Sequence, residues 1–199
     1  VLDRYGNVFQ KIKNDGFKID KIIYNQIEGE NPVTMTKSTG LALIEVASAF
    51  NEIKPNIVFV IGDRHEVMAT AIASAYMNIP LAHTMGGEIS GTIDESIRHS
   101  ITKLAHIHFV ATKKSRENLI KMGELKNNIF LVGCPRMDLI KQHKTLKNEY
   151  INQIVNREGV GDKLDINHAF MLVSHHPVTT EISNQKKSIL AWKIYLEHI

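Results

Sequence analysis

One stretch decides how the chain folds: Ile57-Val58-Phe59-Val60-Ile61-Gly62-Asp63-Arg64. Its first five residues are all β-branched or aromatic, a pattern that predicts a parallel strand buried on both faces. A glycine and two charged residues follow where this strand would end. In open parallel sheets, ligands bind beyond the carboxyl ends of the strands. We therefore expect Asp63 and Arg64 to lie near a binding site.

Strand-like and helical segments alternate on either side of this stretch. A helix beginning near Thr36 precedes it. Three further strands and three further helices follow in turn: strands at Leu81 to Met85, Ile107 to Ala111 and Ile129 to Val132, and helices at Glu66 to Met77, from Thr92, and from Thr112 to Met122. Thr92 and Glu95 have the spacing of a capping box. The alternation predicts an α/β fold, a Rossmann-like parallel sheet with helices on both faces.

Segments outside this core are assigned by the same criteria. Phe17 to Tyr24 and Ala169 to Val173 have the residue content of strands, and Leu146 to Arg157 is typical of a polar amphipathic helix. Residues 158–167 contain two glycines and three acidic residues, and we interpret them as a connector. The predicted first domain is therefore residues 1–160, and residues 161–199 begin a second domain.

Composition excludes several classes of protein. The chain has 199 residues, 43% of them hydrophobic, which is enough to bury a core. The net charge of +3 is too small for a nucleic-acid-binding surface, and no apolar run reaches membrane-spanning length. Cys134 is the only cysteine, which favours a reducing, cytoplasmic setting. Because the chain starts at a valine and ends in an apolar helical segment, we expect a fragment truncated at both ends.

Three acidic residues are candidates for proton transfer. Asp63 directly follows the central strand, where it could face a cleft, pair with the neighbouring Arg64 or cap the next helix. Glu88 follows a Gly-Gly pair that leaves it unshielded, although a solvated loop residue would look the same. Asp94 lies in the first turn of a helix, where the helix dipole favours its ionised form. It could therefore act as a base or simply stabilise the helix.

Glycine and arginine residues accompany these acids. Gly86 and Gly87 can turn tightly and bring the backbone close to a ligand. Arg98 could clamp a phosphate or carboxylate through two hydrogen bonds. Alternatively, Arg98 forms an ion pair with Asp94, four residues earlier on the same helix.

The histidines divide into one candidate and several without a clear partner. His176 precedes a proline, which disfavours helical geometry and would present the side chain from an extended loop. It could carry a proton, contact a phosphate or simply be a surface residue. Three other histidines lack the spacing of metal ligands: His99, His106 and His108. No dinucleotide-binding or P-loop glycine motif is present. We predict neither a metal nor a cofactor.

Taken together, these residues resemble the hydrolysing UDP-N-acetylglucosamine 2-epimerases, the sialic-acid and legionaminic-acid branch of the UDP-N-acetylglucosamine 2-epimerase family. The resemblance spans essentially the whole chain. It rests on an ordered set of motifs: Tyr5-Gly6, Asp15-Gly16-Phe17, Lys37 to Leu43, Ile61-Gly62-Asp63-Arg64, Ile79-Pro80, Gly86-Gly87-Glu88, Asp94 to Lys103, and His176-Pro177-Val178-Thr179. The family implies a GT-B-like two-domain architecture, of which this chain would supply most of the first half and the opening of the second.

The resemblance also implies an activity. It implies elimination of UDP from UDP-N-acetylglucosamine followed by hydration to N-acetylmannosamine, in a cytoplasmic homo-oligomer whose isolated fragment would be a poor enzyme. Asp63, Glu88, Asp94 and His176 are the implied catalytic residues, and any of the three carboxylates could take the C2 proton. The implied substrate-binding residues are Arg64, Gly86, Gly87, Arg98 and Thr179.

Alternatives within and beyond the family stay open. They are the same chemistry on UDP-di-N-acetylbacillosamine or GDP-N-acetylglucosamine, a non-hydrolysing epimerase, a GT-B glycosyltransferase and a non-catalytic nucleotide-sugar-binding protein.

Overall fold

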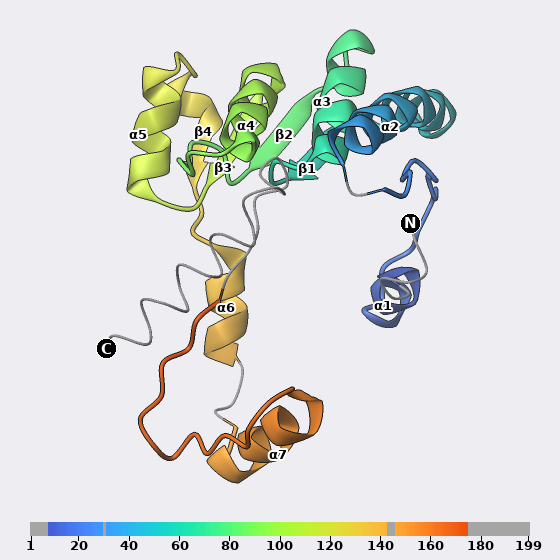
Figure 1. Ribbon diagram of the computed structural model, residues 1–199. Helices are drawn as coiled ribbons and strands as arrows, with labels where there is room; N and C mark the ends of the chain where they lie inside the picture. Colours follow the sequence, from blue (N-terminus) through green and yellow to red (C-terminus); the bar gives the residue numbers. More distant parts are fainter. Residues whose placement is uncertain (1–7, 30, 143–145, 175–199) are drawn as a thin grey trace. The chain divides into compact units, whose positions relative to one another are not determined.

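The computed structural model of the protein describes residues 8–29, 31–142 and 146–174 (Figure 1). These residues divide into two compact units, one within residues 8–134 and the other within residues 135–174. The first unit contains the sheet and most of the candidate site. His176 and Thr179 lie outside the described residues, so their predicted roles stay predictions.

The first unit is built on a parallel sheet in the order β1-β2-β3-β4. The strands are β1 (Val58–Ile61), β2 (Leu81–Thr84), β3 (Ile107–Val110) and β4 (Ile129–Leu131). They are joined by helices α3 (His65–Tyr76), α4 (Ile93–Leu104) and α5 (Lys113–Lys121) (Figure 1). The short 3-10 helix η2 (Lys126–Asn128) precedes β4. The four strands predicted for the sheet are confirmed. Because all four strands run in the same direction, the loops after β1 and β2 lie at the same edge.

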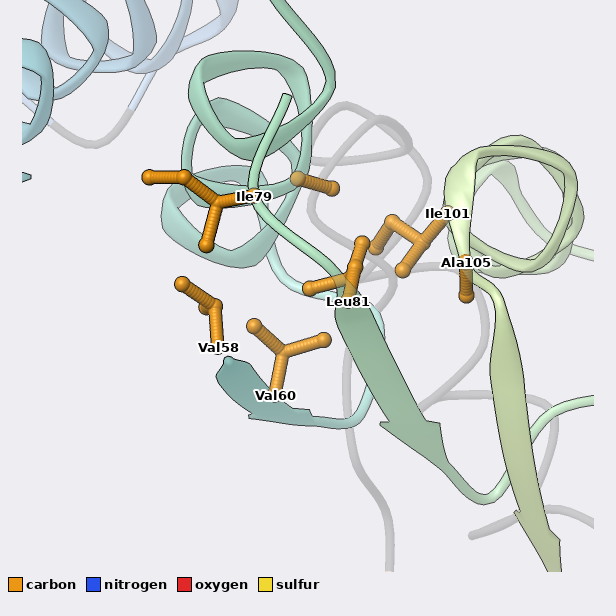
Figure 2. Close-up of a cluster of buried hydrophobic side chains, with 7 residues drawn as sticks. Val58, Val60, Ile79, Leu81, Ile101 and Ala105 are labelled. Atoms are coloured by element: carbon orange, nitrogen blue, oxygen red, sulfur yellow. The ribbon is translucent and has the colours of Figure 1, made fainter. Parts of the chain in front are cut away.

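The core of this unit lies between the sheet and its helices. Val58 and Val60 of β1 and Leu81 of β2 pack with Ile101 of α4 (Figure 2). A second cluster joins Val110, Leu119 and Ile129, under α5. Strand register places the buried residues of neighbouring strands side by side, as in the pairs Val58 with Leu81 and Val60 with His83. This alignment makes one face of the sheet the interior face.

The expectation that β1 is buried on both faces is wrong for the described residues. Val58 and Val60 are buried, but Phe59 and Ile61 are 55% and 64% exposed. Adjacent side chains of a strand point to opposite faces, and the helices α3, α4 and α5 pack on the face that carries the valines. On the opposite face the rings of Phe59, Phe109 and Phe130 form a row, with centroid separations of 5.7 and 5.6 Å.

In the part of the chain that the structure describes, two helices precede the sheet. α1 (Val8–Asn14) is followed by a turn at Gly16, and α2 (Pro32–Ile53) is capped by Asn31, whose side chain accepts a hydrogen bond from Thr34 N. α2 packs along α3. The strand predicted at Phe17 to Tyr24 is wrong: the segment joins no ladder of the sheet, and the ring of Phe17 is exposed.

The second unit contains α6 (Pro135–Gln142) and α7 (Asn148–Glu158). Asparagines one turn apart on α7 hold the segment that follows it: Asn152 Oδ1 accepts from Ile166 N at 2.9 Å, and Asn156 Oδ1 accepts from Leu164 N at 2.8 Å. The predicted strand Ala169–Val173 is wrong, because these residues have no ladder partner among the described residues. The domain boundary near residue 160 stays a prediction.

Across the described ranges, no helix combines the length and the hydropathy that a membrane span requires.

Candidate functional site

The centre of the candidate site is an ion pair between the loop after β1 and the helix α4. Arg98 Nε donates to Asp63 Oδ2 at 2.9 Å, and Arg98 Nη2 donates to the same oxygen. The guanidinium is almost fully buried, with Arg98 only 6% exposed. Asp63 therefore does not cap α3, and its ion-pair partner is Arg98 rather than Arg64. The predicted ion pair between Arg98 and Asp94 is wrong.

Arg98 also reaches the loop that follows β2. Its Nη1 donates to the main-chain oxygen of Glu88 at 2.5 Å, and its Nη2 lies 3.5 Å from Ser90 Oγ. One buried side chain thus contacts both loops that carry predicted catalytic carboxylates. The carboxylate of Glu88 itself is not engaged by this contact, which uses only the backbone.

A pocket of about 240 Å³ opens beside Asp63. It lies among the start of α2, the starts of α3 and α4, and the end of β1. Its lining combines two carboxylates and a histidine with mostly apolar side chains: Asp63, Asp94, His65, Met35, Met68, Ile93, Ile97, Thr36 and Thr39. Asp63 and Asp94, separated by thirty-one positions in sequence, therefore face one cavity.

The loop before α4 is held by Glu95. Thr92 is the N-cap residue as predicted, but its side chain makes no capping hydrogen bond. Glu95 Oε2 instead accepts from Ser90 N and Gly91 N, both at 2.6 Å. These hydrogen bonds from Gly91 and Ser90 hold the pKa of Glu95 below its usual value.

We expect Glu95→Gln to loosen this loop, because an amide oxygen is a weaker acceptor than a carboxylate. Amide hydrogen exchange at Ser90 and Gly91 should become at least several-fold faster, measured by NMR at neutral pH. Lowering the pH through the depressed pKa of Glu95 should likewise reduce the protection factors of these two amides in the wild type, once the slower intrinsic exchange at low pH is taken into account. The control is Glu117→Gln, at an exposed position of α5. Equal exchange rates in the Glu95→Gln variant and the wild type would refute this role.

The two glycines after β2 are enclosed by protein. A Cβ on Gly86 would lie 2.9 Å from Thr102 Oγ1, and a Cβ on Gly87 would lie 2.4 Å from both Ser115 O and Leu119 Cδ1. Asn118 Nδ2 of α5 donates to Gly87 O at 2.8 Å. Both glycines are thus required for packing. Their predicted contact with a ligand through the backbone stays a prediction.

His83 is a polar residue of the site that sequence reasoning missed. It is fully buried in β2, its Nε2–H donates to Gly62 O at 2.9 Å, and its Nδ1 accepts from the hydroxyl of Thr102 at 3.3 Å. Burial lowers the pKa of His83 to about 4, so the ring is neutral at pH 7. The available signal was an imidazole in the middle of the predicted strand Leu81 to Met85, because a buried polar group requires hydrogen-bonding partners.

The other predicted residues lie at the margin of this arrangement. Arg64 is exposed and its Nε donates to Glu66 Oε1 at 3.1 Å. The buried His108 belongs to a separate network that reaches the surface, in which its Nε2 is 3.2 Å from Glu124 Oε2 and Lys103 Nζ donates to Glu124 Oε1. In the described ranges, no three His, Cys, Asp or Glu side chains gather as a metal ion would require.

Fold and site together define a Rossmann-like α/β protein with an acidic pocket at the carboxyl end of a parallel sheet. The sequence profile described as UDP-N-acetylglucosamine 2-epimerase matches residues 2–193, and the chain belongs to this family.

Individual relatives agree with this assignment. The chain is 41% identical over 182 residues to the UDP-N,N'-diacetylbacillosamine 2-epimerase (hydrolyzing) of Legionella pneumophila, covering 92% of this chain and 46% of the relative. It is 31% identical to the GDP/UDP-N,N'-diacetylbacillosamine 2-epimerase (hydrolyzing) of Campylobacter jejuni, covering 93% and 46%. The chain therefore spans about half the length of these relatives.

Solved structures support the predicted fold class. The Methanocaldococcus jannaschii UDP-GlcNAc 2-epimerase, solved in complex with UDP-GlcNAc and UDP, is 27% identical with a TM-score of 0.59, covering 71% of this chain and 38% of that chain. The Rossmann-like α/β class within a GT-B-like architecture is thereby confirmed. The prediction of helices on both faces is not met among the described residues, where α3, α4 and α5 pack on the same face of the sheet.

Proposed function

We propose that the protein is a hydrolysing 2-epimerase that converts UDP-N-acetylglucosamine to N-acetylmannosamine and UDP. Family membership supports the 2-epimerase chemistry, and the names of the Legionella and Campylobacter relatives support the hydrolysing outcome. The ligand named for the Methanocaldococcus structure supports a UDP-linked substrate. The chain covers about half of these relatives, so the activity is proposed for the full-length gene product.

The proposed reaction has two steps. A base removes the C2 proton of the sugar while the bond between C1 and the diphosphate oxygen breaks, which releases UDP and leaves a C1–C2 double bond. Water then adds across this double bond. Its hydroxyl bonds to C1, and a proton bonds to C2 on the face opposite to the one from which the first proton was removed. The product is the free 2-epimeric sugar. Both steps need positioned acids and bases.

The observation that carries the proposal is the shared pocket of Asp63 and Asp94, tied through Arg98 to the Glu88 loop. Three separate segments that carry these carboxylates are thereby brought together at one edge of the sheet, and two of the carboxylates, Asp63 and Asp94, line the same pocket. We assign proton transfer and stabilisation of the cationic sugar to Asp63, Glu88 and Asp94. His176 is proposed as a further proton carrier or diphosphate contact.

The test uses the full-length gene product with UDP-N-acetylglucosamine and no acceptor, followed by NMR. We expect release of both UDP and N-acetylmannosamine, and a loss of at least a hundredfold in kcat for Glu88→Gln, because general acid–base catalysis contributes about 10²- to 10⁴-fold. Glu117→Gln, at an exposed site on α5, is the matched control and should keep wild-type activity.

Other results would redirect the proposal. UDP-N-acetylmannosamine without free UDP would indicate a non-hydrolysing epimerase, and donor consumption only with an acceptor would indicate a glycosyltransferase. UDP-N,N'-diacetylbacillosamine should be assayed in parallel, because the Legionella relative is named for that substrate and is 41% identical. If kcat/KM is at least tenfold higher for UDP-N,N'-diacetylbacillosamine, that sugar nucleotide replaces UDP-N-acetylglucosamine as the proposed substrate.

A further inference from the structure

We propose that Arg98 is a positioning residue, which holds the Asp63 carboxylate and the Glu88 backbone in one fixed arrangement and does not contact the substrate. This inference rests on the proposed function for its catalytic consequence. Its structural part, the coupling of two loops by one side chain, stands independently. It also gives Arg98 a different role from the substrate clamp implied by the family resemblance.

The hydrogen bonds of the guanidinium are already used within the protein. An arginine side chain has five N–H donors. The one on Nε and one on Nη2 are directed to Asp63, one on Nη1 to Glu88 O, and the second on Nη2 faces Ser90 Oγ at 3.5 Å. A side chain that is 6% exposed and commits four donors in this way has little capacity left for a diphosphate.

Neighbouring contacts make the arrangement rigid. His83 donates to Gly62 O, next to Asp63, and Asn118 donates to Gly87 O, next to Glu88. Glu95 holds Ser90 and Gly91 from the other end of the second loop. Each loop is therefore anchored separately to the sheet or to a helix. Arg98 contacts both loops and so links them to each other.

Lysine cannot replace this geometry, because it offers one ammonium group where arginine offers a planar fork. In Arg98→Lys we expect kcat to fall at least a hundredfold, since a displacement of about 1 Å in a catalytic group costs about 10²-fold. KM should change less than threefold, and the affinity for UDP, measured by calorimetry, less than twofold. Arg116→Lys on α5 is the matched control and should match the wild type in all three quantities.

A contact with the substrate predicts the opposite pattern. In that case Arg98→Lys would weaken UDP binding and raise KM at least tenfold while largely preserving kcat, and this result would overturn the inference. An NMR measurement on the wild-type protein also distinguishes a positioning residue from a substrate contact. If Arg98 is a positioning residue, its Nε–H resonance in the wild-type protein should not shift when UDP is added, whereas a ligand contact would move it.

A double-mutant cycle tests the coupling without reference to activity. Unfolding equilibria of Arg98→Lys, Asp63→Asn and the double variant should be non-additive by at least a factor of ten, as for residues in one network. Additive effects would contradict the inference. If the wild-type protein turns over no nucleotide-sugar, the proposed function fails, while the cycle still decides whether Arg98 joins the loops.

Discussion

Gly87→Ala should be among the most destabilising single substitutions in the first unit, lowering the free energy of unfolding by about 2–5 kcal/mol. The backbone of Gly87 has a φ of +79°, which costs an L-residue about 1–2 kcal/mol. The added Cβ would lie 2.4 Å from Ser115 O, a backbone atom that cannot rotate away. Overpacking of this kind costs about 1–3 kcal/mol more. The measurement is urea unfolding followed by circular dichroism.

Gly91→Ala separates the two contributions to this loss. Gly91 also has a positive φ, +70°, but a Cβ there would meet nothing within 4 Å. Its loss should therefore be limited to about 1–2 kcal/mol from the backbone conformation. If the two alanine variants are equally stable, the close contact with α5 contributes nothing and the packing role of Gly87 is wrong.

Stability should fall as the pH decreases from about 6.5 towards 4, in large part through His83. Burial lowers the pKa of His83 in the folded protein to about 4, and the hydrogen bond to Gly62 and the charges around the ring shift it less. Between these pH values the unfolded chain binds a proton that the folded protein excludes. The full stability is therefore present above about 6.5 and is lost as the pH falls, by about 3 kcal/mol at most.

His83→Gln should flatten this pH dependence. Glutamine can still donate to Gly62 O but does not titrate, so the difference in unfolding free energy between pH 7 and pH 5 should shrink. Burial also lowers the pKa of His108. His108 therefore contributes to the pH dependence in the same direction, and part of the dependence should remain in His83→Gln. His168→Gln, at an exposed histidine, is the control and should retain the full slope. An unchanged slope in His83→Gln would show that His83 does not carry the effect.

Local sequence signals were sufficient for the elements of the sheet. The continuous apolar run at Ile57–Ile61 and the alternation of strands and helices predict β1 to β4 within one residue or two, because period and turn residues are local properties. Phe17–Tyr24 and Ala169–Val173 have similar content but form no strand. A strand needs a hydrogen-bonding neighbour, which its own sequence does not specify.

In the candidate site too, some features could be predicted from local sequence and others could not. Sequence placed Asp63, Glu88 and Asp94 at strand ends and in a helix first turn, where parallel topology gathers side chains at one edge of the sheet. It could not predict that Arg98 pairs with Asp63, thirty-five positions away, rather than with Asp94. The i,i+4 spacing predicts an ion pair between Asp94 and Arg98 from the helix alone. In the folded protein the buried guanidinium instead forms two hydrogen bonds to Asp63, which the fold places beside it.

The sequence by itself determined the α/β class and the order in which strands and helices follow one another along the chain, because both follow from periodicity and local backbone preference. It also determined which side chains are available for chemistry. Only the tertiary structure decided that Gly86 and Gly87 face protein, that His83 is neutral between Gly62 and Thr102, and that Arg98 joins two loops. These features depend on contacts between segments far apart in the chain. Such contacts depend on how the helices that connect the strands pack on the sheet, and no local sequence pattern specifies this packing.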